Sequence, residues 1–266
     1  MTFASKNHKQ STVSRERDFY LCYSYNMQGN GRQSMNKPSY DLPVFEEPQD
    51  FRSSMHWRIF RIMAELMDGW QFLADFRNNV AIFGSGNIDP NHAWCKEAEK
   101  LGRLLTEEGF DVVTGGGPGI MEAANRGATT AENEVRGKSV GLNIKLGRKV
   151  RANPYIEKST AFHYFFVRNL MMNYTGRAYV YFPGGLGTLD NLTAIITLIQ
   201  TKKISIKVPI ILISHEFWDP VARWIVEKML NKYNAISKED VDLYVIVDTA
   251  EEAMEYIRKS PIRNEF

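Results

Sequence analysis

Apolar and polar positions alternate in blocks along the chain from residue 51 onward. Short runs that are apolar throughout are typical of buried strands, whereas apolar residues at steps of three and four are typical of helices. The runs predict strands at 80–83, 111–114, 139–144, 178–182, 208–213 and 243–247. The helical spacing predicts helices at 55–73, 94–105, 119–130, 162–175, 188–202, 217–232 and 249–258.

The predicted strands and helices alternate through short connections, which is typical of one doubly wound α/β domain. Because the strands are apolar throughout, both of their faces should be covered, as in a mostly parallel sheet with helices on both faces. We therefore expect an α/β fold with a single domain at 77–266. A helix within 51–76 precedes this domain, and its apolar face must cover either the sheet or a partner.

Residues 1–50 differ from the rest of the chain, because they are rich in Ser, Asn and Gln and show no apolar periodicity. Such a segment cannot bury enough apolar surface to offset the entropy that is lost on ordering. We predict a flexible polar arm with a weakly basic character. It is either a solvated tail or a contact for an anionic partner such as RNA.

Charge and cysteine content exclude several classes of protein. The chain has 33 Lys and Arg against 31 Asp and Glu, and a net charge of +2 gives no field that would attract nucleic acid. Two cysteines are too few for a disulfide framework or a cysteine-based zinc site, and we predict that Cys95 faces away from the apolar stripe of its helix.

No apolar run reaches the ~18 residues that span a bilayer, and the N-terminus lacks the apolar core of a secretory signal. We expect a soluble, cytoplasmic protein with neither nucleic acid nor membrane as a partner.

Glycine-rich turns follow three of the predicted strands directly, at 84–86, 115–119 and 183–188. In an open parallel sheet, ligands bind beyond the carboxyl ends of the strands. Glycine lets the backbone approach an anion closely, and the helix after each turn points unpaired N–H groups at the same place. The turns predict a phosphate site that is formed by Gly84, Ser85, Gly86, Gly115, Gly116, Gly117, Gly119, Gly184, Gly185, Gly187 and Thr188.

Each turn by itself is a weak signal, but the combination narrows the class of ligand. None of the turns has the full Gly-x-Gly-x-x-Gly pattern of dinucleotide sites, and no complete Gly-x-x-x-x-Gly-Lys-Ser/Thr pattern of a P-loop is present. The turn at 183–188 opens a helix and supplies clustered N–H donors together with a hydroxyl. A mononucleotide or a sugar phosphate fits this arrangement better than a dinucleotide, and we expect no cofactor and no metal.

The third turn and two other motifs resemble a known family. Pro183-Gly-Gly-Leu-Gly-Thr-Leu-Asp-Asn191 resembles the Pro-Gly-Gly-x-Gly-Thr-x-x-Glu signature of the LOG (Lonely Guy) family, whose members are often labelled lysine decarboxylase. Residues 115–121 are similar to its second glycine motif, and Phe165-x-x-Arg168-Asn169 stands where the family has Met-x-x-Arg-Lys. The resemblance covers residues 78–258. It implies a Rossmann-like homodimer that binds nucleoside 5′-monophosphates, with Thr197 as one nucleotide contact.

The resemblance also implies a reaction. Active members of the family hydrolyse the N-glycosidic bond of AMP or cytokinin riboside monophosphates, releasing a free base and ribose 5-phosphate. Breaking this bond builds positive charge on the sugar, so a carboxylate is needed to stabilise it or to activate water. A guanidinium suits the phosphate or the leaving base. In the family these roles fall to the Arg of Met-x-x-Arg-Lys and the Glu of the glycine signature.

This sequence departs from the family at three charged positions. Asn191 replaces the signature Glu, Asn169 replaces the Lys, and Lys149 aligns with a further family Glu. Asp190 is offset from Asn191 by about 100° around a helix, so it substitutes only if the loop shifts. The candidate catalytic residues are Arg168, Asp190 and Asn191. Two alternatives stay open: a hydrolase with an altered acid, and a non-catalytic sensor of nucleotides or phosphates on the same fold.

Overall fold

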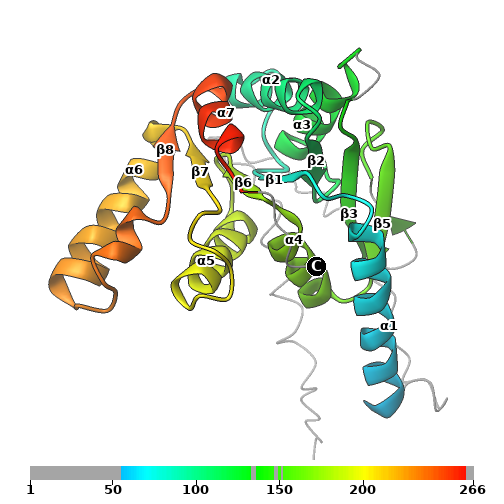
Figure 1. The fold of residues 1–266 in the computed structure, drawn as a ribbon, viewed down its shortest axis with the longest axis horizontal. Helices are drawn as coiled ribbons and strands as arrows, with labels where there is room; N and C mark the ends of the chain where they lie inside the picture. The colour runs from blue at the N-terminus through cyan, green and yellow to red at the C-terminus, as the bar shows by residue number, and fades with distance from the viewer. Residues whose placement is uncertain (1–54, 133–135, 147–148, 151, 262–266) are drawn as a thin grey trace, which may run out of the picture. The chain divides into compact units, whose positions relative to one another are not determined.

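The computed structural model of the 266-residue chain describes residues 55–132, 136–146, 149–150 and 152–261 (Figure 1). The predicted polar arm at 1–50 lies outside these residues. The described residues form an α/β fold around one mostly parallel sheet, so the predicted fold class is confirmed.

Most of the sheet is parallel, with strands in the spatial order β5-β3-β2-β1-β6-β7-β8. These strands are β1 (Asn79–Phe83), β2 (Asp111–Thr114), β3 (Ser139–Leu146), β5 (Lys158–Phe162), β6 (Ala178–Tyr181), β7 (Ile210–Ile213) and β8 (Val245–Val247). A short strand, β4 (Lys149–Val150), pairs antiparallel with the end of β3.

Helices cover both faces of the sheet. They are α1 (Met55–Leu73), α2 (Ala93–Glu107), α3 (Ile120–Thr129), α4 (Phe165–Thr175), α5 (Leu186–Gln200), α6 (His215–Trp224) and α7 (Ala250–Arg258). Helices α2, α3 and α7 pack on one face, and α1, α4, α5 and α6 pack on the other (Figure 1). Within β1, Val80 and Ile82 face the first group while Ala81 and Phe83 face the second. Because both faces are covered, the strand is apolar from Val80 to Phe83, as predicted.

The strand β5 is an element that the sequence pattern did not predict. Its sequence, Lys-Ser-Thr-Ala-Phe, is mostly polar, and its first two side chains are exposed. Among the described residues it pairs only with β3, at the edge of the sheet, where a continuous apolar run is not required. The predicted helix at 217–232 also differs, because α6 passes into a π-helical segment at Ile225–Lys232.

Helix α1, whose packing the sequence left open, lies against α4 and β5. Its Glu65 carboxylate accepts hydrogen bonds from the N–H groups of His163 at 2.9 Å and Tyr164 at 3.1 Å, just before α4 begins. A Cβ at Gly69 would crowd the Met171 side chain, so this glycine lets α1 approach α4 closely. Within the described residues, no helix has both the length and the apolar composition needed to cross a bilayer.

Two glycines let α2 and α3 approach each other at the backbone. A Cβ at Gly102 would overlap Ala124 O, and a Cβ at Gly127 would overlap Glu99 O. The same pair of helices is joined by an ion pair in which Arg126 Nη2 lies 2.7 Å from Glu99 Oε2. This close approach fixes α3, the helix that follows the second glycine turn, against α2.

We expect Gly127→Ala to lower the free energy of unfolding by roughly 1–3 kcal/mol, because the added methyl meets backbone that cannot move aside. Thermal unfolding monitored by circular dichroism measures this loss. The control is Gly86→Ala, since the nearest atom to a Cβ there is 3.6 Å away, at Met121 Cε. Equal unfolding temperatures for the two variants would contradict the close approach of α2 and α3.

The prediction that Cys95 faces away from the apolar stripe of its helix is wrong. Cys95 is fully buried in the core beneath α2, and its thiol donates to Asp89 O at 3.4 Å. Burial raises the pKa of the Cys95 thiol, which keeps it protonated and therefore poorly reactive.

Candidate functional site

The three glycine turns lie at one edge of the sheet, the carboxyl edge, at which β1, β2 and β6 end. Strand β1 lies between β2 and β6. The chain passes from β1 towards β2 and β3, and after β5 it returns to the opposite side of β1 as β6. Loops leave such a switch point in opposite directions, which is where α/β sheets leave room for a ligand.

Backbone hydrogen bonds join the turns to one another. The Ser85 N–H donates to Pro183 O at 3.0 Å, and Ser85 O accepts from the Ile120 N–H at 3.0 Å. The first turn is therefore fixed between the second and the third. The structure therefore brings together the three predicted turns, 84–86, 115–119 and 183–188. The N–H and C=O groups of Ser85 both bond to the neighbouring turns.

Contacts inside the protein explain several of the glycines. Gly116 and Gly119 have φ angles of +72° and +68°, a region that residues with a Cβ rarely adopt. A Cβ at Gly119 would also overlap Ser85 O, and a Cβ at Gly115 would overlap the guanidinium of Arg168. These glycines are needed for the turns to pack, whatever they bind.

Gly185 is different, because nothing in the described chain requires it to be glycine. A Cβ at this position would meet no atom within 4 Å, and its φ of −89° suits any residue. At the neighbouring Gly184, by contrast, a Cβ would overlap the Thr188 side chain. The open space beside Gly185 is therefore the place where a ligand can approach the third turn closely.

The third turn offers hydrogen-bond donors at this open place. The Thr188 N–H donates to Gly185 O at 3.0 Å, whereas the N–H groups of Gly185, Leu186 and Gly187 make no hydrogen bond within the described residues. The same holds for the Gly117 N–H in the second turn. Unpaired N–H groups at the start of α5, together with the positive end of its dipole, favour an anion.

Arg168 extends from α4 to the carboxyl edge. Its Nε donates to Leu142 O of β3 at 3.1 Å, and its Nη1 donates to Asn169 Oδ1 at 3.2 Å. The guanidinium lies against the Cα of Gly115. Arg168 is thus held by the backbone of β3 beside the second glycine turn.

Asp190 is linked to Arg168 through Asn169. The Asn169 Nδ2 donates to Asp190 Oδ2 at 3.0 Å, while Asn169 Oδ1 accepts from Arg168. The series Arg168–Asn169–Asp190 joins α4 to the N-terminal part of α5. Asn169, which replaces a family lysine and which the sequence analysis treated only as a loss of charge, is therefore a further residue of the candidate site.

Asn191, which stands where the LOG signature has Glu, lies beneath the third turn. Its side chain is buried, and its Nδ2 donates to Gly187 O at 2.7 Å. Burial raises the pKa of Tyr181, so the phenol stays protonated and donates to Asn191 O at 3.2 Å. Asn191 stabilises the turn from below, whereas Asp190 is linked to Arg168 through the side chain of Asn169.

The structure separates the two predicted threonines. Thr188 is buried in the third turn, with its side chain against Gly184. Thr197 is exposed on α5, about 14 Å farther along the helix axis, and its Oγ1 donates to Thr193 O at 2.8 Å. Within one chain, Thr197 is not brought together with the glycine turns.

Asn143 is a residue of this edge that the sequence analysis missed. It lies on β3, is 1% exposed, and its Oδ1 has no hydrogen-bond partner in the described residues. A Cβ at Gly116 would overlap this oxygen. The available signal was an amide within an otherwise apolar strand, Val-Gly-Leu-Asn-Ile, close to its carboxyl end.

The fold and the site define the class of protein: a Rossmann-like α/β protein whose switch point carries three joined glycine turns. In the described part of the chain, His, Cys, Asp and Glu form no group of three or more that could hold a metal ion. A family model described as "Possible lysine decarboxylase" matches residues 121–257. The chain belongs to this family, the LOG family, so the resemblance seen in the sequence is confirmed.

Three relatives that the chain resembles share a quarter or less of their aligned residues with it. A 134-residue stretch is 25% identical to an uncharacterized protein of Archaeoglobus fulgidus, covering 50% of this chain and 82% of that protein. The X-ray structure of TM1055, a structural genomics target, is 22% identical, with a TM-score of 0.51 over 68% of this chain and 99% of that chain. A molybdenum cofactor binding protein from the phototrophic bacterium Rippkaea orientalis is also 22% identical, with a TM-score of 0.49 over 68% of this chain and 93% of that chain. The likeness to TM1055 shows a shared fold.

Proposed function

We propose that this chain binds a nucleoside 5′-monophosphate such as AMP at the carboxyl edge and hydrolyses its N-glycosidic bond. Water adds to C1′ of the sugar as the bond to the base breaks, and the products are the free base and ribose 5-phosphate. The observation that carries this proposal is the hydrogen-bonded series Arg168–Asn169–Asp190 beside the joined glycine turns.

The third turn supports binding of the phosphate. Its unpaired N–H groups at 185–187 lie at the start of α5, and the space beside Gly185 is open. A phosphate monoester accepts several hydrogen bonds from such a cluster, and the helix dipole adds to the attraction. The guanidinium of Arg168, which lies beside the second glycine turn, supplies positive charge, and its paired N–H donors suit phosphate oxygens.

Asp190 supports hydrolysis. Its exposed carboxylate is held by Asn169, so one oxygen is oriented while the other is free to face the sugar or a water molecule. A carboxylate in this place stabilises the positive charge that develops on the ribose and accepts a proton from the attacking water. In this proposal Asp190 takes over the work of the family Glu.

The proposal is tested by incubating the purified protein with AMP and with a cytokinin riboside monophosphate, and by measuring the free base by chromatography. We expect release of adenine or cytokinin in step with ribose 5-phosphate. Isothermal titration calorimetry with AMP, at a temperature where turnover is slow, measures binding independently. Absence of both binding and release would contradict the whole proposal.

A second candidate function is non-catalytic binding of a nucleotide or phosphate ligand. The observation that favours it is Asn191, because an amide that is buried and bonded to Gly187 O replaces the carboxylate of the family signature. Binding of AMP in calorimetry without any base release would support this candidate and exclude the hydrolase.

We expect Gly185→Ala to weaken AMP binding by at least about ten-fold while leaving the unfolding temperature nearly unchanged. The added methyl meets no protein atom within 4 Å, so it occupies only the space proposed for the phosphate. Calorimetry gives the dissociation constant, and differential scanning calorimetry gives the unfolding temperature. An unaltered affinity for AMP in a folded Gly185→Ala protein would place the phosphate elsewhere.

The homodimer that the LOG resemblance implies is part of the proposal. The packed α1 and α4 leave large apolar side chains exposed, among them Phe60 at 61%, Met67 at 69% and Phe166 at 56%. Apolar side chains that gather on adjacent helices favour an interface. The family resemblance indicates that the partner at this interface is a second copy of this chain.

We expect sedimentation velocity to give a dimer for the wild type, and the double variant Phe60→Glu/Phe166→Glu to raise the dissociation constant of the dimer by 100-fold or more. Each glutamate replaces apolar contacts at the interface, and burying its unpaired charge costs desolvation free energy. Tyr233→Glu is the control, because Tyr233 is 68% exposed but lies beyond the π-helical segment. A double variant that remains as dimeric as the control would exclude this face.

A further inference from the structure

A network of buried polar side chains lies directly behind the second glycine turn. At its centre Asn125 Oδ1 accepts hydrogen bonds from Thr114 Oγ1 at 2.6 Å and from Asn153 Nδ2 at 2.9 Å. The Asn125 Nδ2 donates to Ser139 Oγ at 2.9 Å. Thr114, Asn125 and Ser139 are fully buried, and no buried polar side-chain atom of these four residues lacks a partner. Such a complete network specifies one arrangement of the segments that it joins.

The network fixes the backbone of the second turn at three atoms. Thr114 Oγ1 accepts from the Gly116 N–H at 3.0 Å. The Asn153 N–H donates to Gly116 O at 2.9 Å, and its Nδ2 donates to Gly117 O at 3.1 Å. Since a trans peptide holds its N–H opposite its C=O, the Gly117 N–H points away from Asn153. That N–H makes no hydrogen bond within the described residues.

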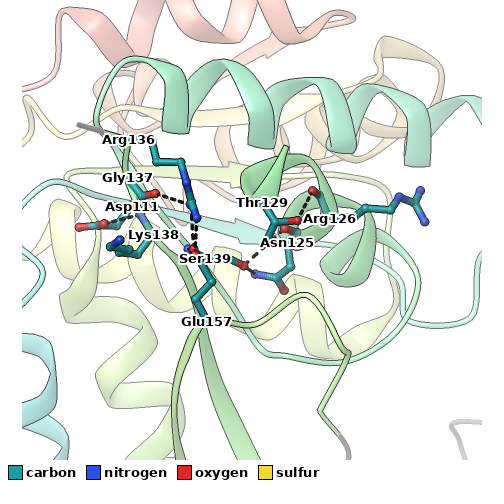
Figure 2. A network of polar contacts seen from close by, with 9 residues as sticks. All are labelled: Asp111, Asn125, Arg126, Thr129, Arg136, Gly137, Lys138, Ser139 and Glu157. Carbon is teal, nitrogen blue, oxygen red and sulfur yellow. Dashed lines mark hydrogen bonds and ion pairs between the residues drawn. The ribbon is translucent and has the colours of Figure 1, made fainter. Parts of the chain in front are cut away.

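The outer side of the network is anchored in the sheet. Figure 2 shows Asn125 and Ser139 close together, with Arg136 and Glu157 beyond them. The Ser139 N–H donates to Glu157 Oε2 at 2.9 Å, and Arg136 pairs with both oxygens of that carboxylate. The hydrogen bond from the Arg136 guanidinium lowers the pKa of Glu157, which favours the charged form of this carboxylate. Ser139 begins β3, so the network ties the turn to the sheet and not to a loose loop.

We propose that Thr114, Asn125 and Asn153 are positioning residues, which hold the second turn so that the Gly117 N–H donates to the phosphate of the bound nucleotide. This inference rests on the proposed function and adds a specific role to a part of the chain that does not touch the ligand. Apolar residues of the same size would fill this part of the core equally well, so the polar set serves to direct the backbone.

The test compares Thr114→Val, which removes the hydroxyl and keeps the shape, with Thr114→Ser, which keeps the hydroxyl. We expect the dissociation constant for AMP to rise about ten-fold in Thr114→Val and to return close to the wild-type value in Thr114→Ser. KM for hydrolysis should follow the dissociation constant, while kcat changes by no more than about two-fold. In spectra of ligand-free protein labelled with ¹⁵N-glycine, the Gly116 and Gly117 signals should move in Thr114→Val, and the Gly185 signal should stay in place.

If Thr114→Val unfolds, Asn153→Ala serves in its place, because it removes the bond to Gly117 O at the less buried end of the network. AMP binding to Thr114→Val as tight as binding to wild type would overturn the inference and leave the proposed function standing. Equal losses in Thr114→Val and Thr114→Ser would also overturn it, since packing and not the hydroxyl would then matter. A wild type that binds neither AMP nor ribose 5-phosphate would overturn the proposed function and this inference together.

Discussion

Replacing Asp190 with Asn lowers kcat/KM for AMP hydrolysis by roughly 10²–10⁴-fold, which is the usual contribution of a positioned general base. Asn has the shape of Asp and can still bond to Asn169, but it carries no charge to stabilise the sugar cation or to accept a proton. The side chain is exposed, so the unfolding temperature should stay the same. Base release under conditions well below KM measures the change.

The matched control is Asp75→Asn, an exposed acid between α1 and β1 at the opposite edge of the sheet, which should keep full activity. Asn191→Glu separates the two neighbouring positions. If Asp190→Asn stays active and Asn191→Glu gains activity, the carboxylate belongs at 191, and the role assigned to Asp190 is wrong. If Asp190→Asn loses activity and Asn191→Glu does not restore it in the double variant, the assignment stands.

Replacing Arg168 with Lys lowers kcat/KM by roughly 10²–10³-fold, comparable to the loss of one preorganised donor in an active site. Lysine keeps the charge but has a single ammonium group, which cannot bond to Leu142 O and Asn169 Oδ1 at once and still face the ligand. The loss also frees Asn169, so the orientation of Asp190 is lost with it. Steady-state kinetics with AMP measures the effect.

Arg223→Lys on α6 is the control for this change, because Arg223 is exposed and lies outside the site. Calorimetry with AMP then divides the loss between binding and chemistry. A retained affinity with a reduced kcat would assign Arg168 to the reaction, whereas a raised dissociation constant would assign it to the phosphate. Wild-type kinetics in Arg168→Lys would show that the guanidinium has neither role.

Local patterns predicted most of the fold. Mostly apolar runs placed β1, β2, β3, β6, β7 and β8 to within a few residues, because strands covered on both faces are apolar at most positions. The same rule failed for β5, whose partly exposed position at the sheet edge leaves a polar sequence. A glycine within a helix, such as Gly69 in α1, is locally unfavourable, yet its lack of a side chain lets α1 meet Met171 of α4.

The candidate site was predictable only where its parts follow strands directly. A strand and the turn after it are adjacent in sequence, and parallel strands end at the same edge, so the meeting of the three turns could be expected. The contacts of Asn169 with Asp190, 21 residues apart, and of Asn125 with Asn153, 28 residues apart, have no local pattern. Side chains without a repeating period give no signal of the partner that folding brings to them.

By itself, the sequence determined that this protein has a helix-covered parallel sheet, that three glycine turns share one edge of it, and that its motifs are those of the LOG family. Only the tertiary structure decided that Asp190 is bonded into the series with Arg168, that Asn191 lies beneath the turn, and that a buried network directs the Gly117 N–H. The physical reason is that apolar periodicity reports which face of a helix or strand is buried. Residues that are close in the sequence are enough to show that periodicity. The direction of a polar side chain depends on a partner that is distant in the chain, and that direction exists only once the chain is folded.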